Sequence, residues 1–298
     1  MALKYKNIGI TARSQMDGKD DAILHVIETI EREGGKALID PERCTGALMK
    51  KRACYRSQKS LDALIVLGGD GTILRAVRER TNSSIPLMTI NKGTLGFLAE
   101  MSLEEVTTML PKFMRGYGKI EERRLLSISV KRGSKTIVSG NVLNEAVIAQ
   151  GAISRLIDLE TTVNGDPLTT FHADGVILAT PTGSTAYSLA AGGPVVHPEL
   201  PAMIVTPINP HSFTQKPIVL PSSSKLAIMI QTKANKFGDV KVSLTLDGQT
   251  YVTLTRGDIL HVTVAPEKVR FIRRPEETYF GTLRNKLKWG ERLEGERE

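Results

Sequence analysis

Apolar positions in the first part of the chain follow two alternating rhythms. Short apolar runs predict β-strands over residues 7–12, 37–40, 61–67 and 85–90. Between them, apolar residues at helical spacing predict helices over residues 20–33, 72–80 and 103–116, the last interrupted by Pro111. Strands that alternate with helices are typical of a parallel sheet covered by helices. We therefore expect an α/β domain over residues 1–121.

The rhythm changes after about residue 121, where alternating apolar and polar positions replace helical spacing. Such runs predict strands within residues 125–149, 156–171, 240–254 and 258–266. Asn164-Gly165 and Asp247-Gly248 stand between extended runs, and these dipeptides favour tight β-hairpins. We expect an all-β domain over residues 122–272, because little of this segment has helical spacing. The tail at 273–298 is expected to pack back on the first domain, with a helix at 276–289.

The fold class that follows is α/β plus all-β, with an N-terminal Rossmann-like domain and a C-terminal β-sandwich. Apolar residues make up 41% and charged residues 24% of the 298 residues, which is ordinary for a globular protein. No stretch approaches the roughly 18 apolar residues of a membrane span, so we expect no membrane partner. Cys44 and Cys54 lack His or Cys companions, which favours reduced, incidental thiols and a cytoplasmic location.

The chain carries 40 basic and 32 acidic side chains, a formal net charge of +8. An excess of positive charge attracts polyanions, either nucleic acid or a phosphorylated small molecule. Aromatic residues make up only 5%, and no basic run alternates with them as a base-stacking surface would. We therefore interpret these charges first as a solvated surface and second as an attraction for a nucleotide, and we expect no nucleic acid as a partner.

The segment GGDGT follows the third predicted strand. Gly68, Gly69 and Gly71 allow main-chain N–H groups to approach an anion closely, and Thr72 is expected to cap the next helix. Open α/β sheets bind ligands at the carboxyl ends of their strands. The segment is not a P-loop, and Leu74 stands where the dinucleotide fingerprint requires its third glycine.

Asp70 lies between these glycines. An isolated Asp-Gly is usually a turn, but a carboxylate beside a phosphate-binding loop can take the proton from an attacking hydroxyl or help to place Mg²⁺. We expect Asp70 to be the base of a phosphoryl transfer to an alcohol. The segment at 90–100, after the next strand, is either a tight loop or a second wall of the same crevice.

Two further segments are candidates for ligand binding. Asn144-Glu145 interrupts an apolar strand, either as a strand-end pair or as a pair that binds ribose hydroxyls. Asp174 precedes a predicted strand at 176–180, and the hydroxyl-rich loop TPTGSTAYS follows it. Ser and Thr are common in turns, so composition alone assigns this loop no role. The absence of G-x-S-x-G argues against a nucleophile elbow.

Taken together, these segments resemble the NAD kinase family, in particular its bacterial members. The resemblance is carried by GGDGTIL, INKGTLGFL, NEAVI, DGVILATPTGSTAYSLAAGGPVVHP, VTPINPHSFTQKPIVLP, DGQ and YFGTLRNKLKWGERL. GGDG alone is shared with diacylglycerol and sphingosine kinases, whereas the TPTGSTAYS block is far more specific. The resemblance implies transfer of the γ-phosphoryl group of ATP to the 2′-hydroxyl of the adenosine ribose of NAD, giving NADP, with Mg²⁺. It also implies a homodimer or homotetramer with active sites completed across subunits, and it leaves polyphosphate open as a second donor.

By matching positions, the resemblance implies that Asp70 is the base. The residues that it implies for phosphate binding are Gly68, Gly69, Gly71 and Thr72. Those that it implies for NAD binding are Gly71, Phe97, Asn144, Glu145, His172, Asp174, Thr185, Ala186, Tyr187, Ser188, His211 and Gln249. In this set the Asn-Glu pair would hold ribose and adenine-side groups, residues 185–188 would line the adenine pocket, and Asp174 would contact the nicotinamide end. His172 is a candidate for the choice between NAD and NADH, and no metal ligand is assigned.

Two alternatives stay open at this point. A lipid kinase would share GGDGT but would need an apolar cleft for an acyl chain. A non-catalytic dinucleotide-binding regulator would bind NAD, tolerate loss of Asp70 and show no dependence on Mg²⁺.

Overall fold

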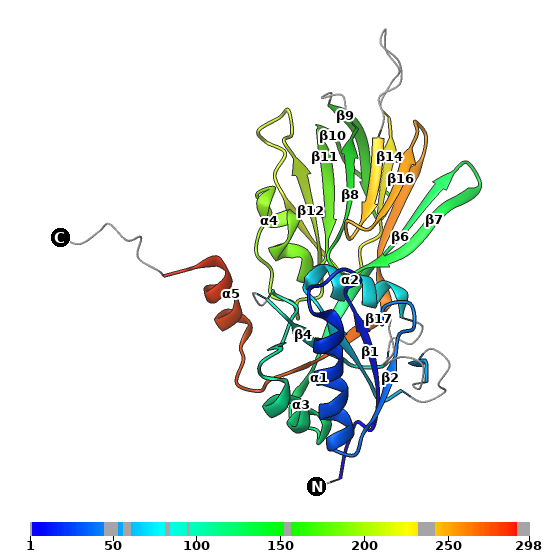
Figure 1. Cartoon of the computed structure of the whole chain (residues 1–298). Coiled ribbons are helices and arrows are strands. Elements are labelled where there is room, and N and C mark those ends of the chain that lie inside the picture. The colour runs from blue at the N-terminus through cyan, green and yellow to red at the C-terminus, as the bar shows by residue number, and fades with distance from the viewer. Residues whose placement is uncertain are drawn as a thin grey trace, which may run out of the picture. The chain divides into compact units, whose positions relative to one another are not determined.

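The computed structural model describes residues 2–44, 53–55, 61–80, 84–93, 96–151, 156–231 and 242–290. The chain divides into two compact units (Figure 1). The first unit comprises residues 1–122 together with 269–298, and the second comprises residues 123–268. Two long strands, β6 (Lys119–Arg132) and β17 (Ile259–Arg273), run along the chain from one unit into the other.

A parallel sheet forms the centre of the first unit. Its main strands lie in the spatial order β4, β3, β1, β2. Their bounds are β1 Asn7–Ala12, β2 Lys36–Ile39, β3 Ala63–Leu67 and β4 Leu87–Asn91. The short β5 (Met101–Ser102) and Phe271 of β17 pair with the other edge of β4. Every residue of β3 and β4 is buried, which confirms the interpretation of these runs as covered parallel strands.

Helices complete the first unit. They are α1 Lys19–Arg32, α2 Asp70–Glu79, α3 Val106–Met114 and α5 Tyr279–Leu287. The predicted apolar stripe of α1 is buried in one core with β1 and α3. Cys44 lies in this core as well, as a buried free thiol, although its neighbours in the sequence are polar. Burial raises the pKa of its thiol to about 11, which keeps the sulfur protonated.

The second unit consists of two antiparallel layers. One layer has the strand order β13-β12-β11-β8-β15-β16, and the other contains β10, β9, β14 and the first part of β17, with β6 and β7. The bounds are β7 Lys135–Val142, β8 Glu145–Gln150, β9 Ile157–Val163, β10 Asp166–Ala173, β11 Gly175–Ala179, β12 Ala202–Ile208, β13 Ile218–Pro221, β14 Leu226–Ile230, β15 Val242–Leu246 and β16 Thr250–Leu254. Both layers contribute fully buried side chains to a shared core, among them Ile148, Leu178, Ile228 and Leu260. The predicted β-sandwich is confirmed.

The two predicted hairpin turns have the backbone that their sequences favour. Asn164 and Gly165 have φ values of 54° and 91°, and Asp247 and Gly248 have 48° and 64°. Two successive positive φ angles match the right-handed twist of the flanking strands, and Asn-Gly and Asp-Gly tolerate them best.

One segment of the second unit departs from the all-β expectation. The loop after β11 forms a 3₁₀ turn, η3 (Thr182–Thr185), followed by the one-turn helix α4 (Tyr187–Ala190). Hydroxyl groups support this turn: Thr180 Oγ1 accepts from the Gly183 N–H at 3.0 Å, and Ser184 Oγ donates to the Pro181 carbonyl at 2.7 Å. Local side-chain bonds of this kind let the backbone leave the sheet.

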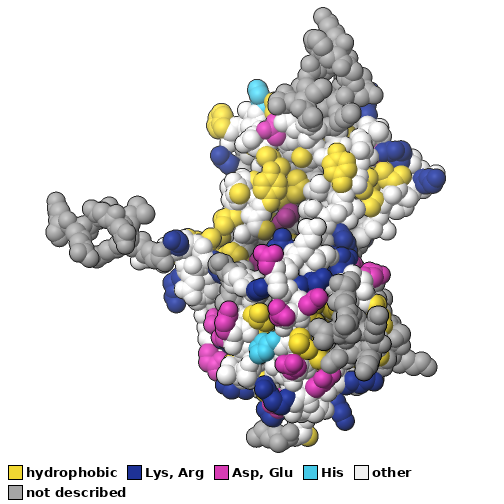
Figure 2. All heavy atoms as spheres, viewed as in Figure 1, with side chains coloured by type: hydrophobic (Ala, Val, Ile, Leu, Met, Phe, Trp, Pro, Cys, Tyr) yellow, Lys and Arg dark blue, Asp and Glu magenta, His cyan; other side chains and the backbone are white. Residues whose placement is uncertain are grey.

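The two units differ in their surfaces. On the face shown in Figure 2, acidic side chains gather on the first unit, whereas hydrophobic side chains are more frequent on the second. Among the described residues, no helix is long and apolar enough to cross a membrane.

Candidate functional site

The glycine segment leads directly from β3 into α2. Gly68 has a φ of 147°, and a Cβ there would lie 2.5 Å from Thr72 Oγ1, so only glycine fits. Gly69 is the last residue before α2, and Asp70 is its first. The expectation that Thr72 caps this helix was wrong, because the helix begins two residues earlier. Thr72 instead lies inside it with a buried side chain.

The start of α2 also provides open space next to main-chain groups. A Cβ at Gly69 or Gly71 would meet no atom within 4 Å. The N-terminus of a helix directs N–H groups and the positive end of the helix dipole toward an anion. The geometry of this loop therefore suits a phosphate group.

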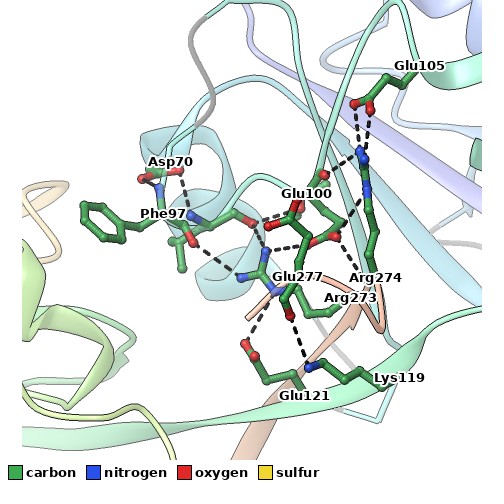
Figure 3. A network of polar contacts seen from close by, with 11 residues as sticks. Asp70, Phe97, Glu100, Glu105, Lys119, Glu121, Arg273, Arg274 and Glu277 are labelled. Carbon is green, nitrogen blue, oxygen red and sulfur yellow. Dashed lines mark hydrogen bonds and ion pairs between the residues drawn. The ribbon is translucent and has the colours of Figure 1, made fainter. Parts of the chain in front are cut away.

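The Asp70 carboxylate is held by the segment that follows β4. The Phe97 N–H donates to Oδ2 at 2.9 Å, and the Leu98 N–H donates to Oδ1 at 3.2 Å (Figure 3). Gly96 lies against the same carboxylate, since a Cβ there would come within 2.1 Å of Oδ1. The contacts of residues 96–98 with Asp70 agree with the hypothesis that this segment is a second wall of the site, whereas residues 94 and 95 of the same segment lie outside the described residues. Asp70 stays partly exposed, so it is fixed but reachable.

In the second unit, Asp247 holds the Asn144-Glu145 segment. Its Oδ2 accepts from the Leu143 N–H at 2.8 Å, and its Oδ1 accepts from the N–H groups of Asn144 at 2.8 Å and Glu145 at 3.0 Å. Asp247 is itself buried, at the first position of the turn between β15 and β16. We assigned Asp247 no role from the sequence beyond this turn. The Asp-Gly signal identified the turn but not what its side chain would bind.

Glu145 is a buried carboxyl group with one unsatisfied oxygen. The residue is 9% exposed, and its Oε2 has no hydrogen-bond partner. Burial, and secondly the nearby charge of Asp247, raise its pKa to about 7. An unsatisfied buried oxygen calls for an explanation, and a ligand hydroxyl would supply the missing partner.

The loop after β11 packs directly on this segment. The Thr180 N–H donates to the Asn144 carbonyl at 2.9 Å, and Thr180 Oγ1 donates to the Leu143 carbonyl at 2.5 Å. A Cβ at Gly183 would lie 2.1 Å from the Asn144 oxygen, so glycine is required for this approach. The structure therefore brings Asn144, Glu145 and the start of the TPTGSTAYS block together.

The residues expected to line an adenine pocket fall into two groups. Thr185 and Ala186 are partly exposed, and Tyr187 is exposed, so all three are accessible. Ser188 is fully buried, and its hydroxyl is hydrogen-bonded to that of Thr206 at 2.9 Å, which places it beneath the surface. Gln249, two residues after Asp247, is partly exposed in the turn between β15 and β16.

Asp174 lies at the opposite end of β11. Its Oδ1 accepts from Gln150 Nε2 at 2.8 Å, and its Oδ2 accepts from Asn209 Nδ2 at 3.0 Å. Glu145 pairs with Ala179 at the far end of the same strand. Five strand residues span about 17 Å, so one small group cannot touch Asp174 and Glu145 at once.

Two histidines lie close to one another in the same unit as Asp174. The His211 N–H donates to the His172 carbonyl at 2.8 Å, and the two rings meet edge to face with centroids 5.6 Å apart. The exposed His172 ring bonds Asp158 Oδ1 through Nδ1 at 2.7 Å. The predicted NAD-binding residues of the second unit therefore form separate groups.

No preformed metal centre is evident in the described part of the chain. Within it, no group of three or more His, Cys, Asp or Glu side chains is placed to hold an ion.

A glycine loop at the carboxyl ends of a parallel sheet, joined in one chain to a β-sandwich with polar strand ends, defines a nucleotide-binding α/β protein. Within that class, the ATP-NAD kinase N-terminal domain matches residues 8–118, and the ATP-NAD kinase C-terminal domain matches residues 143–274. This chain belongs to the NAD kinase family, whose members are phosphotransferases. The resemblance seen in the motifs is confirmed, and the two alternatives gain no support.

Individual relatives agree with this assignment. The NAD kinase of Geobacter sulfurreducens is 47% identical over 231 residues, covering 78% of this chain and 80% of the relative. That of Solibacter usitatus is 38% identical over 288 residues, covering 96% and 99%. The crystal structure of yeast NADH kinase complexed with NADH has a TM-score of 0.86 at 25% identity, covering 99% of this chain and 90% of that one. An NAD kinase from Archaeoglobus fulgidus in complex with ATP shares the fold, with a TM-score of 0.72 at 24% identity over 95% of this chain and 98% of that one.

Proposed function

We propose that this chain transfers the γ-phosphoryl group of ATP to the 2′-hydroxyl of the adenosine ribose of NAD, producing NADP, in a Mg²⁺-dependent reaction. Membership of the NAD kinase family supports the class of reaction. The observation that carries the proposal is the Asp70 carboxylate. It is partly exposed, fixed by two main-chain N–H groups, and located at the start of α2 beside a glycine loop suited to phosphate.

In this mechanism Asp70 acts as the general base. Each of its oxygens accepts one main-chain N–H, which orients the carboxylate and leaves lone pairs for a ligand hydroxyl. Asp70 takes the proton of the 2′-hydroxyl as that oxygen bonds to the γ-phosphorus, and the bond to the ADP oxygen breaks. Phosphoryl transfer passes through a loose transition state, so the contribution of the protein is mainly positioning.

The glycine loop would bind the phosphates of the donor through Gly68, Gly69 and Gly71. Mg²⁺ in such sites keeps several waters and is held largely through the substrate phosphates, so it would bind beside this loop together with the phosphates of the donor. Because Asp70 has to stay free to accept a proton, we assign no residue of this chain as its ligand. The ion supplies neutralisation of the phosphate charge. The structure of the Archaeoglobus fulgidus kinase was solved with ATP bound. Assays of this chain should therefore compare ATP with polyphosphate as the phosphoryl donor.

For NAD, we assign the ribose hydroxyls to Asn144 and Glu145, since the unsatisfied Glu145 oxygen is a ready acceptor. The accessible Thr185, Ala186 and Tyr187 would line the adenine. Asp174 would bind the nicotinamide end. Asp174 and Glu145 lie at opposite ends of β11, so they would bind different parts of a dinucleotide. The homodimer or homotetramer with active sites completed across subunits is proposed from the family resemblance.

The activity is tested by incubating the purified protein with NAD, ATP and Mg²⁺ and detecting NADP with an NADP-specific dehydrogenase. Asp70→Asn should make almost no NADP. Asp62→Asn is the matched control, because Asp62 Oδ2 also accepts two main-chain N–H groups, from Lys6 and Asn7, immediately before β3. Equal turnover by the wild type and Asp70→Asn would exclude Asp70 as the base, and no NADP with ATP, polyphosphate, NAD or NADH would exclude the activity.

Completion across subunits has its own test. If each active site takes Asp70 from one subunit and Asp174 from another, Asp70→Asn and Asp174→Asn should both be inactive alone. Refolding or co-expressing the two variants together should restore activity, because mixed oligomers contain sites with both residues intact. No recovery in a demonstrated mixed oligomer would place both aspartates in the same subunit's site.

Two finer expectations stay predictions. If His172 affects the choice of dinucleotide, His172→Ala should change the ratio of activities with NAD and NADH, and an unchanged ratio would remove the hypothesis. The cytoplasmic location also stays a prediction, to be checked by fractionation of cells that express the chain.

A further inference from the structure

The end of β17 carries a buried arginine in a network of polar contacts (Figure 3). Arg273 is 7% exposed. Its Nη1 donates to Glu100 Oε2 at 3.0 Å, and its Nε donates to Glu121 Oε1 at 3.4 Å. These two carboxylates neutralise the buried cation, but they use only part of the donors that a guanidinium carries.

The other hydrogen bonds of Arg273 go to main-chain carbonyls, and its guanidinium also lies over the Phe271 ring, 5.2 Å from the centroid. Nη1 also donates to the Leu98 oxygen at 3.1 Å, and Nη2 reaches the Phe97 oxygen at 3.5 Å. Thr89 Oγ1 donates to the same Leu98 oxygen at 2.9 Å. The guanidinium thus holds two successive carbonyl groups of the segment after β4.

The same two residues bind Asp70 through their N–H groups. The Phe97 carbonyl and the Leu98 N–H belong to a single peptide group, with Arg273 at its oxygen and Asp70 at its hydrogen. A hydrogen bond to a peptide oxygen polarises the group and strengthens the bond made by its N–H. The segment at 97–98 therefore lies between the cation and the carboxylate and is bound by both.

We propose that Arg273 is a positioning residue for Asp70, acting through the 97–98 peptide groups to fix the carboxylate at the angle that proton removal requires. The inference rests on the proposed function, in which Asp70 is the base. Arg273 touches neither nucleotide nor reacting atoms in this scheme. Its effect on turnover passes entirely through the main chain that it holds.

Arg274 offers a matched comparison in the same network. Its guanidinium donates to Glu105 at 2.8 and 2.7 Å and to the Glu100 carbonyl at 3.0 Å. Substituting either arginine by glutamine removes a cation from a set of partly buried ion pairs. Only the Arg273 substitution releases the carbonyls of Phe97 and Leu98.

The test is a double-mutant cycle on kcat with the full-length chain. Arg273→Gln should lower kcat by about 10²-fold, the cost of a displacement near 1 Å at a reacting group, with little change in KM for NAD. In an Asp70→Asn background the same substitution should cost only a small fraction of that loss, because the carboxylate that it positions is gone. Arg274→Gln should lower the melting temperature by about as much as Arg273→Gln does, but it should leave kcat close to that of the wild type.

The outcomes separate this inference from the proposed function. If the Arg273→Gln and Asp70→Asn losses multiply, or if Arg274→Gln lowers kcat as much as Arg273→Gln, Arg273 is only structural and the inference is overturned. If Asp70→Asn keeps the wild-type kcat, the base assignment itself is wrong. Should Arg273→Gln fail to fold, Arg273→Lys keeps the charge but loses the forked geometry, and it should show the same coupling with a smaller loss.

Discussion

Two aspartates, one in each unit, bind main-chain N–H groups, and their surroundings differ. Asp70 accepts two such bonds at the partly exposed first residue of α2. Asp247 accepts three at a buried turn. Amide contacts alone therefore do not mark a reactive carboxylate. The difference lies in whether the carboxylate keeps lone pairs and open space for a ligand, as Asp70 does, or is enclosed by the segment that it holds.

The two aspartates also affect their neighbours differently. The charge of Asp247 adds to the effect of burial in raising the pKa of Glu145, so the second unit contains a buried, unsatisfied carboxyl group next to a structural one. Asp70 lies under a segment whose carbonyl side is held by a buried cation. If this comparison is right, Asp70 matters for turnover and Asp247 for stability, and substitutions should separate the two.

The largest effect is expected at Asp70. Asp70→Asn should lower kcat by about 10²–10⁴-fold, the usual contribution of a general base. Its free energy of unfolding should change by no more than about 1 kcal/mol, because water can replace the bonds of a partly exposed group. Steady-state kinetics and urea unfolding of the same preparation measure both. A large loss of stability with a small loss of kcat would reverse the comparison.

Asp247 should show the opposite profile. Asp247→Ala leaves the N–H groups of Leu143, Asn144 and Glu145 without their acceptor, and each unsatisfied buried donor costs about 1–3 kcal/mol. We expect the free energy of unfolding, measured in urea, to fall by about 3 kcal/mol or more. Asp247→Asn, which keeps one acceptor oxygen, should lose less. A stability equal to that of the wild type would show that water reaches this turn.

Several features of both regions could be predicted because their signals are local. Short motifs such as glycines before a helix, or Asn-Gly and Asp-Gly between strands, favour a particular backbone conformation within a few residues. The start of α2 was misplaced by two residues, since Gly69 itself precedes the helix and no side-chain cap marks that boundary.

The partners of Asp247 and Arg273 could not be predicted, because they are tertiary contacts. Asp247 binds residues more than a hundred positions earlier in the sequence, and Arg273 binds carbonyls still further away. Neither residue type nor spacing encodes such a contact. The burial of Cys44 could not be predicted for the same reason: the core that buries it is built from β1, α1 and α3, not from its own segment of the sequence.

Substitution of Gly96 can change the orientation of the Asp70 carboxylate without removing it. The methyl group of Gly96→Ala would collide with Oδ1 and turn the carboxylate, so kcat should fall by about 10²-fold while the charge is kept. Gly93→Ala is the control, since a Cβ there meets nothing within 4 Å. Equal kcat values for the two variants would mean that the orientation of Asp70 is not critical.

The smallest effect concerns Glu145 and depends on pH. Its folded-state pKa of about 7 lies above the ordinary 4.5, so the folded chain keeps a proton that the unfolded chain has released. The stability that the neutral carboxyl provides is therefore complete below about pH 4.5 and is lost as the pH rises toward 7. The full pKa shift of Glu145 corresponds to about 3 kcal/mol of stability. Replacing the carboxyl group by an amide would avoid this loss at high pH, but the buried amide would lack hydrogen-bond partners, which costs about 1–2 kcal/mol.

Glu145→Gln cannot ionise, so it should be about 1–2 kcal/mol more stable than the wild type at pH 8 and lose this advantage at pH 5. Urea unfolding without nucleotide at the two pH values measures this, with the exposed Glu267→Gln as the control. The affinity of the same variant for NAD tests whether the buried carboxyl group of Glu145 serves ligand binding. A variant that gains stability and loses affinity would show that Glu145 is kept for binding, whereas unchanged affinity would leave the carboxyl without a role at the ribose.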